Sequence, residues 1–284
     1  MICADDLIDD VLRGDAAALE RLLLSVQDQV YNMALRMLWH PADAADATQE
    51  ILIRVVTHLD GFQRRCAFST WVYRIASNYL LTTRKRRAEQ EEATFELFAA
   101  ELQIGSQDLP STLGPEEALL VQEIKVGCTH AMLLCLDRDQ RLAYILGEIF
   151  QLPATEAAAV LEIAPEAFRK RLSRARERIG SFMSEHCGLA RAENGCRCPR
   201  RIARAKSRGR IHPDRLLFVG QPQAQRDRPN PDPRAAQEEM ESFVAAAEAL
   251  RANPWYAVPR DRIRALRSLL ESLDYHLLRS SDHE

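Results

Sequence analysis

The chain has 284 residues, 46% of them hydrophobic and 6% aromatic, which is enough for one large domain or two to three small ones. Its net charge of −3 excludes a uniformly basic nucleic-acid binder, but the charges are segregated. Four aspartates lie within residues 5–10, whereas cations gather in residues 84–87, 169–178 and 197–215. This segregation fits one polypeptide partner and one polyanionic partner, although ordinary solvated helix faces would show it too.

Alanine, leucine, glutamate and arginine fill long stretches with few β-branched runs, which predicts an all-α protein. No signal peptide and no bilayer-spanning apolar run is apparent, so we expect a cytoplasmic protein without a membrane partner. We do not expect its seven cysteines to form disulfides in that compartment.

Breaker residues divide the chain into four parts. Residues 5–87 are predicted to form a helical domain, and residues 88–115 a polar, acidic, flexible linker. Residues 116–186 read as a second helical domain. Residues 187–284 hold a Cys/Arg-rich segment, a proline-rich linker and a small helical C-terminal extension.

Residues 42–59 are predicted to form an amphipathic helix that begins near Pro41. Its apolar face is expected to hold Ala44, Ala47, Thr48, Ile51, Leu52, Val55, Val56 and Leu59. Its polar face carries Asp43, Asp46, Gln49, Glu50 and Arg54. Periodicity alone favours a solvated face of a helix bundle here.

Gly61 ends that helix, and the next helix is predicted over residues 71–87 with Ser69 or Thr70 as its N-cap. An exposed aromatic loop followed by a basic helix could hold unstacked bases of a single strand. The cations at the helix end also suit the helix dipole. The candidate nucleic-acid contacts are Phe62, Arg64, Arg65, Phe68, Trp71, Arg74, Asn78, Arg84, Lys85, Arg86 and Arg87.

The second domain contains a predicted helix-turn-helix, with a short helix over 154–161 and a long basic helix from Pro165 to Phe182. Asp137 is expected to N-cap the helix before it. The strongly one-sided charge favours DNA over a solvated bundle face. Candidate base readers are Glu166, Arg169, Lys170 and Ser173, and candidate phosphate contacts are Arg171, Arg174 and Arg176.

The C-terminal part carries a cluster of possible metal ligands: His186, Cys187, Cys196 and Cys198. Three thiolates and an imidazole suit tetrahedral zinc. A redox switch is an alternative, because flanking arginines would lower the thiolate pKa. Reduced, unliganded cysteines are the plainest interpretation.

The rest of the tail combines a basic stretch, 202–215, with helical spacing in 240–250 and 261–278. The basic stretch is predicted to be a mobile arm on DNA. The two helices would form a hairpin around residues 253–256 and act as a regulatory module that docks on the domains before it.

Three motifs resemble extracytoplasmic-function (ECF) sigma factors. Asp43–Glu50 resembles the acidic helix D-A-E-D-x-x-Q-E of region 2, and Phe68–Asn78 resembles F-x-T-W-L-Y-R-I-A-x-N. Arg169–Arg176 is similar to V-K-S-R-L-S-R-A-R of region 4. The likeness covers roughly residues 5–182. It departs at Glu162, where the family usually has glycine, and at Ala167-Phe168, usually Thr-Val.

The resemblance implies a non-enzymatic subunit that needs no cofactor and has core RNA polymerase and promoter DNA as partners. The helix with Asp46 would bind the β′ clamp helices, and the loop 61–68 would capture a base flipped from the minus-ten element. Region 4 would bind the minus-thirty-five element and the β flap. An anti-sigma factor is a further partner that the resemblance allows.

Two other classes of protein remain open from the sequence. A stand-alone helix-turn-helix regulator would share the second domain but would need neither motif of the first. A metal- or thiol-dependent enzyme would use Cys187, Cys196 and Cys198, yet no acid/base pair, nucleophile triad or phosphate loop accompanies them.

Overall fold

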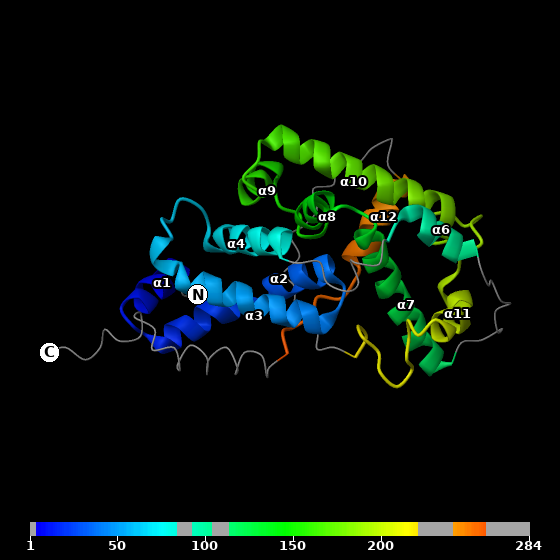
Figure 1. Ribbon diagram of the computed structural model, residues 1–284, viewed down its shortest axis with the longest axis horizontal. Coiled ribbons are helices and arrows are strands. Elements are labelled where there is room, and N and C mark those ends of the chain that lie inside the picture. Colours follow the sequence, from blue (N-terminus) through cyan, green and yellow to red (C-terminus); the bar gives the residue numbers. More distant parts are fainter. Residues whose placement is uncertain (1–3, 84–92, 104–113, 221–240, 260–284) are drawn as a thin grey trace.

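The computed structural model describes residues 4–83, 93–103, 114–220 and 241–259 (Figure 1). Within these ranges all regular elements are helical, and Cys187 and Cys196 form an isolated bridge, so the all-α prediction is confirmed. None of the described helices is long and apolar enough to cross a membrane. The predicted contacts at 84–87 and the predicted helix at 261–278 lie outside the described residues.

The first domain is a bundle whose long helices pack side by side (Figure 1). Its helices are α1 (Ala4–Leu12), α2 (Ala16–Leu38), α3 (Pro41–Thr57), the short η1 (Leu59–Gly61) and α4 (Phe68–Thr82). The carboxylate of Asp15 caps α2 by accepting from the backbone N–H of Ala17 and Ala18 at 2.8 and 3.0 Å. Pro41 stands in the first turn of α3, and the apolar face predicted for residues 42–59 is buried against the bundle.

The second domain contains α6 (Phe95–Gln103), α7 (Pro115–Leu134), α8 (Arg138–Tyr144), the π-helical turn η2 (Ile145–Ile149), α9 (Ala154–Val160) and α10 (Pro165–His186). Asp137 caps α8 as predicted, accepting from the N–H of Gln140 at 2.7 Å. Glu162 takes the turn between α9 and α10 with φ of 53°, the left-handed conformation that explains why a glycine suits this position.

Helix α6 lies within the range predicted as a linker. Its Phe95 and Phe98 pack on Phe182 of α10, with ring centroids 5.2 and 5.0 Å apart. Two aromatic rings on one face of a short helix bury enough apolar surface to hold it on the second domain.

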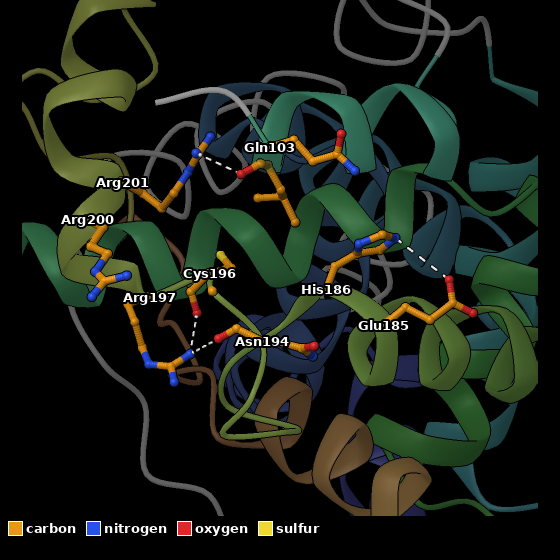
Figure 2. Close-up of a pocket in the computed structure, with 10 residues that line it drawn as sticks. Gln103, Glu185, His186, Asn194, Cys196, Arg197, Arg200 and Arg201 are labelled. Atoms are coloured by element: carbon orange, nitrogen blue, oxygen red, sulfur yellow. Dashed lines mark hydrogen bonds and ion pairs between the residues drawn. The ribbon is translucent and has the colours of Figure 1, made fainter. Parts of the chain in front are cut away.

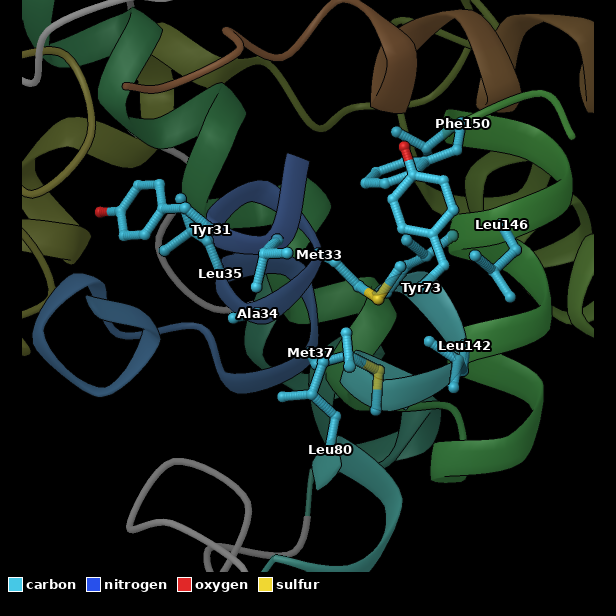
Figure 3. Close-up of a cluster of buried hydrophobic side chains, with 14 of the residues drawn as sticks. Tyr31, Met33, Ala34, Leu35, Met37, Tyr73, Leu80, Leu142, Leu146 and Phe150 are labelled. Carbon is cyan, nitrogen blue, oxygen red and sulfur yellow. The ribbon is translucent and has the colours of Figure 1, made fainter. Parts of the chain in front are cut away.

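The two domains share one hydrophobic core (Figure 3). Met33 and Met37 of α2 and Tyr73 of α4 face Leu142 and Leu146 of the second domain, as Figure 3 shows. The core continues into α10, where a Cβ on Gly147 would meet a Leu172 methyl at 2.7 Å, so any larger residue would require Leu172 to move.

A buried arginine joins the domains beside this core. Arg141 of α8 has only 4% of its surface exposed. Its guanidinium donates to the carbonyls of Met37 at 2.5 Å, Leu133 at 2.9 Å and Leu136 at 3.0 Å. Carbonyls at the ends of α2 and α7 are thereby satisfied by one side chain.

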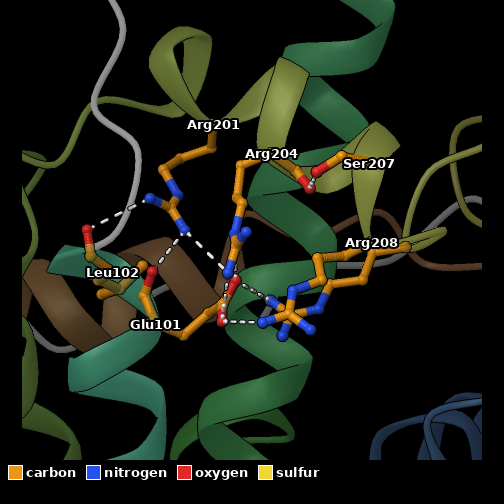
Figure 4. A network of polar contacts seen from close by, with 7 residues as sticks. Glu101, Leu102, Arg201, Arg204, Ser207 and Arg208 are labelled. Atoms are coloured by element: carbon orange, nitrogen blue, oxygen red, sulfur yellow. Dashed lines mark hydrogen bonds and ion pairs between the residues drawn. The ribbon is translucent and has the colours of Figure 1, made fainter.

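The C-terminal part adds η3 (Cys198–Arg201), α11 (Ile202–Ser207) and α12 (Glu241–Arg251). Glu101 of α6 has a side chain that is only 12% exposed (Figure 4). Its carboxylate forms ion pairs with arginines of the stretch that was predicted to be a mobile arm. Arg204 lies 3.0 Å from this carboxylate, and Arg208 and Arg210 each lie 3.7 Å from it. The mobile-arm prediction is therefore wrong for these residues, because a shielded carboxylate binds them to α6.

Candidate nucleic-acid and polymerase interface

The polar side chains predicted on α3 do lie together on the side of the helix turned away from the core. Asp43, Asp46 and Gln49 are half-buried, and Glu50 and Arg54 are exposed. The guanidinium of Arg54 also lies 5.0 Å from the ring centroid of Tyr79 on α4. A mixed acidic and polar helix face of this kind suits a polypeptide partner that carries complementary charge.

The aromatic loop differs from its prediction. Phe62 and Phe68 are 8% and 6% exposed. With Trp71 they form a triangle whose ring centroids are 5.2 to 5.9 Å apart. The expectation of two exposed rings is wrong, because each ring finds an apolar partner in the other two. The loop surface carries two exposed cationic side chains, Arg64 and Arg65. Arg64 is paired with Asp9.

Helix α4 begins earlier than predicted and is partly covered. It starts at Phe68, with Ala67 as an N-cap that supplies no side-chain hydrogen bond. The predicted cap Thr70 instead donates its hydroxyl to Glu156 of α9 at 2.6 Å. Arg74 lies 3.9 Å from the carboxylate of Glu162. Asn78 is exposed, so α4 keeps an open polar position beside two that the second domain contacts.

The outer face of α10 is open. Phe168, Leu172, Ala175 and Ile179 are buried as predicted. Lys170, Ser173 and Arg174 are exposed, and Arg169 forms only a surface pair with Glu166, at 3.1 Å. These residues lie in the N-terminal half of the second helix of the helix-turn-helix, the part that enters a major groove in proteins of this type.

Two of the predicted phosphate contacts on α10 have partners inside the domain. Arg171 donates to Asp139 at 2.8 Å. Arg176 donates from Nε to Glu148 at 2.6 Å, and that carboxylate is 5% exposed. Arg176 is held by Glu148 in this conformation although its side chain is 47% exposed, so its phosphate contact stays a prediction. Glu148 could have been noticed from the sequence, because it is the one charged residue within the apolar run 142–149.

His186 lies beside the cysteine segment, but its ring has partners of its own. The His186 ring lies against Phe182 and near Glu185, and Figure 2 shows it directed away from Cys196. The N–H of Gly188 donates to the carbonyl of Cys196 at 3.1 Å, and a hollow of about 230 Å³ opens beside this loop. Cys187 accepts a weak bond from the N–H of Leu189 at 3.5 Å.

The fourth thiol near this segment is Cys128 of α7, which sequence analysis missed because it lies far away along the chain. Burial raises the pKa of Cys128, and the nearby Cys187, Cys198 and Cys196 raise it further. Burial likewise raises the pKa of Cys196, and that of Cys198 to about 11. The predicted lowering of these pKa values by flanking arginines is wrong, because desolvation outweighs the cations.

The described residues contain no group of three or more His, Cys, Asp or Glu side chains arranged to hold a metal ion. The thiols would have to converge before they could bind zinc. The structure thus brings the three predicted thiols and Cys128 into one region, while His186 lines the hollow beside Cys196 with its ring nitrogen turned towards Glu185.

Comparison with known proteins gives two family matches and several relatives. The models for sigma-70 region 2 and sigma-70 region 4 match residues 22–90 and 127–179. The chain is 34% identical over 176 residues to the RNA polymerase sigma-H factor of Pseudomonas aeruginosa, covering 61% of this chain and 90% of that one. It is 30% identical over 177 residues to the ECF RNA polymerase sigma-E factor of Escherichia coli K12, with coverage of 61% and 90%.

Among solved structures, CnrH in complex with the cytosolic domain of CnrY matches with 24% identity and a TM-score of 0.45, over 64% of this chain and 97% of that one. The sigma factor RpoE in complex with the anti-sigma factor NepR from Bartonella quintana matches with 21% identity and a TM-score of 0.40, over 58% and 95%.

Proposed function

The chain belongs to the ECF RNA polymerase sigma factors, and on that premise we propose that it binds core RNA polymerase and directs transcription initiation at promoters read by its two domains. Sigma factors are not enzymes, and none of the contacts proposed below needs a catalytic group. The observation that carries the proposal is the pairing of an outward polar face on α3 with an open basic face on α10.

We propose that α3 binds the β′ clamp helices of the polymerase through Asp43, Asp46, Gln49, Glu50 and Arg54. This assignment is supported by the position of all five side chains on one side of the helix. The β flap is the proposed second polymerase contact and would be bound by the second domain. An anti-sigma factor stays a prediction.

For the minus-ten element, the proposed contacts are α4 and the loop before it. Asn78 and Arg74 would hold the non-template strand, and Arg65 would contact phosphates. Capture of a flipped base offsets lost stacking, which costs a few kcal/mol per base. Since Phe62 and Phe68 are buried, base capture at this loop requires the aromatic triangle to open.

For the minus-thirty-five element, α10 supplies the proposed contacts. Glu166, Arg169, Lys170 and Ser173 would read base edges in the major groove, and Arg174 would hold a phosphate. Exposure of this face supports the assignment.

Promoter binding with and without core polymerase tests the proposal against a stand-alone regulator. We expect purified chain to give run-off transcripts and shifted promoter DNA only when core polymerase is present. A specific shift by the chain alone, at the same affinity, would favour the regulator and overturn the sigma assignment.

Zinc at the cysteine segment stays a separate proposal, with Cys128 in the place of His186. The weak N–H bond to the sulfur of Cys187 supports it, because such bonds stabilise thiolate ligands. We expect zinc in the purified chain to be lost in a Cys196→Ser/Cys198→Ser variant and retained in His186→Ala. Equal and negligible zinc in the wild-type chain and both variants would rule out the zinc site.

A further inference from the structure

The described end of the C-terminal extension bridges the two domains; we call residues 251–258 the clasp. Helix α12, which precedes it, packs on α10, η2 and α7 (Figure 1). Arg251 then donates to the carbonyl oxygen and the carboxylate of Glu148, both at 2.8 Å. Asn253 donates to the hydroxyl of Thr129 on α7 at 2.7 Å. The first half of the clasp is therefore fixed to the second domain.

The second half of the clasp is fixed to α2 of the first domain. The amide of Asn32 pairs with both backbone groups of Tyr256, accepting from its N–H at 3.0 Å and donating to its carbonyl at 2.7 Å. The N–H of Val258 donates to Asp28 at 2.9 Å. Tyr256 is fully buried. These bonds satisfy an otherwise extended backbone with side chains of one helix.

Trp255 lies at the junction between the two halves. Its ring is 5.0 Å from the guanidinium of Arg36 on α2 and 4.9 Å from the ring of Phe150, which follows η2. Phe150 in turn lies 5.5 Å from Tyr73 of α4. One side chain of the extension therefore contacts both domains.

The closed arrangement is incompatible with simultaneous binding of two promoter elements. The minus-ten and minus-thirty-five elements are centred about 25 base pairs apart, or roughly 85 Å of B-DNA. Here Thr70 of α4 is bonded directly to Glu156 of α9, and Arg74 is paired with Glu162. The two proposed DNA-binding surfaces can reach their elements only if the domains separate.

We propose that the clasp is an autoinhibitory contact that holds the two DNA-binding domains together and must be released before a promoter is engaged; this rests on the proposed sigma function. The apparent affinity for a ligand falls in proportion to the population of the competent state. Weakening the clasp should raise that population and hence promoter activity at limiting protein.

The test uses Trp255→Ala in the full chain, with Glu248→Ala on the exposed side of α12 as the matched control. Run-off transcription is titrated with chain at fixed core polymerase. We expect Trp255→Ala to lower the concentration for half-maximal transcript about tenfold, and Glu248→Ala to leave it unchanged. Small-angle scattering of the free proteins should show a larger radius of gyration for Trp255→Ala alone.

An unchanged or higher half-maximal concentration in a folded Trp255→Ala protein would overturn the clasp, as would an unchanged radius of gyration. If Trp255→Ala does not fold, Asn253→Ala replaces it with the same criteria. A wild-type chain that gives no transcript at any concentration would defeat the proposed function instead. The scattering comparison would then still decide whether the clasp holds the domains closed.

Discussion

Helices α4 and α10 are the two proposed DNA-binding helices, and they differ in how much the rest of the chain covers them. Contacts from α9 and the turn after it cover α4 at Thr70 and Arg74. The outer face of α10 is open at Lys170 and Arg174. The same polypeptide thus presents one surface that is ready for DNA and one that depends on domain movement.

The difference teaches that exposure of a motif cannot be judged from the motif itself. The α4 motif is the closer match to its family, yet it is the covered one. Its position against the second domain is set by the shared core, to which its own Tyr73 contributes, and by contacts to Glu156 and Glu162, which lie far from the motif in the sequence.

The largest expected effect concerns the residue that joins the domains. Arg141→Met should lower the free energy of unfolding by about 3 kcal/mol, because it leaves several buried carbonyls unsatisfied at about 1–3 kcal/mol each. Urea denaturation measures the loss. The exposed Arg191→Met should change stability by no more than about 0.5 kcal/mol. Equal stability of Arg141→Met and wild type would show that Arg141 does not hold the two domains together.

Acid should destabilise the chain through His130 of α7, whose buried ring packs on Trp39 and Phe218 with centroids 6.2 and 5.0 Å apart. Burial, and then the charge of Arg36, lower the pKa of His130 to about 3. The ordinary value in the unfolded chain is about 6.5, so stability is complete above that pH and is lost as pH falls toward 3. Between pH 7 and pH 5 the loss should be about 2 kcal/mol.

Urea denaturation at both pH values measures this loss, and His130→Gln is the control. The variant should lose about 2 kcal/mol less than wild type over the same interval. Identical pH dependence in the two proteins would show that His130 titrates normally.

Substitution of Asn78 tests the exposed polar position on α4, the helix that the second domain partly covers. Asn78→Ala should slow promoter opening about fivefold, because one hydrogen bond to an unstacked base contributes about 1 kcal/mol. Permanganate footprinting measures opening, and co-purification measures core binding. Binding to core should be unchanged; a matching loss of core binding would show that α4 serves the polymerase and not the DNA.

Substitutions at Arg174 and Arg176 compare an arginine on the open face of α10 with one that is bonded to Glu148. Arg174→Ala should weaken binding of the polymerase complex to promoter DNA several-fold and reduce the salt slope by about one. Arg176→Ala should leave the slope unchanged, because its guanidinium is bound to Glu148. Filter binding over a range of salt concentrations distinguishes them. Equal slopes for the two variants would place both arginines on DNA.

Sequence reasoning succeeded where a local pattern reports burial. The apolar positions of α3 and the stripe containing Leu172 and Ile179 were predictable, since a period of 3.6 residues describes one buried helix face. It failed where side chains find partners that periodicity does not report. Phe62 is buried by Phe68 and Trp71 of the same loop region, and Thr70 is bonded to Glu156 of α9, which lies far away along the chain.

Association with core RNA polymerase tests the central claim most directly. Size-exclusion chromatography of an equimolar mixture at modest salt should place the chain in the polymerase peak, and Glu50→Arg on the exposed side of α3 should reduce that fraction. A chain that elutes separately from core polymerase under these conditions would contradict the account.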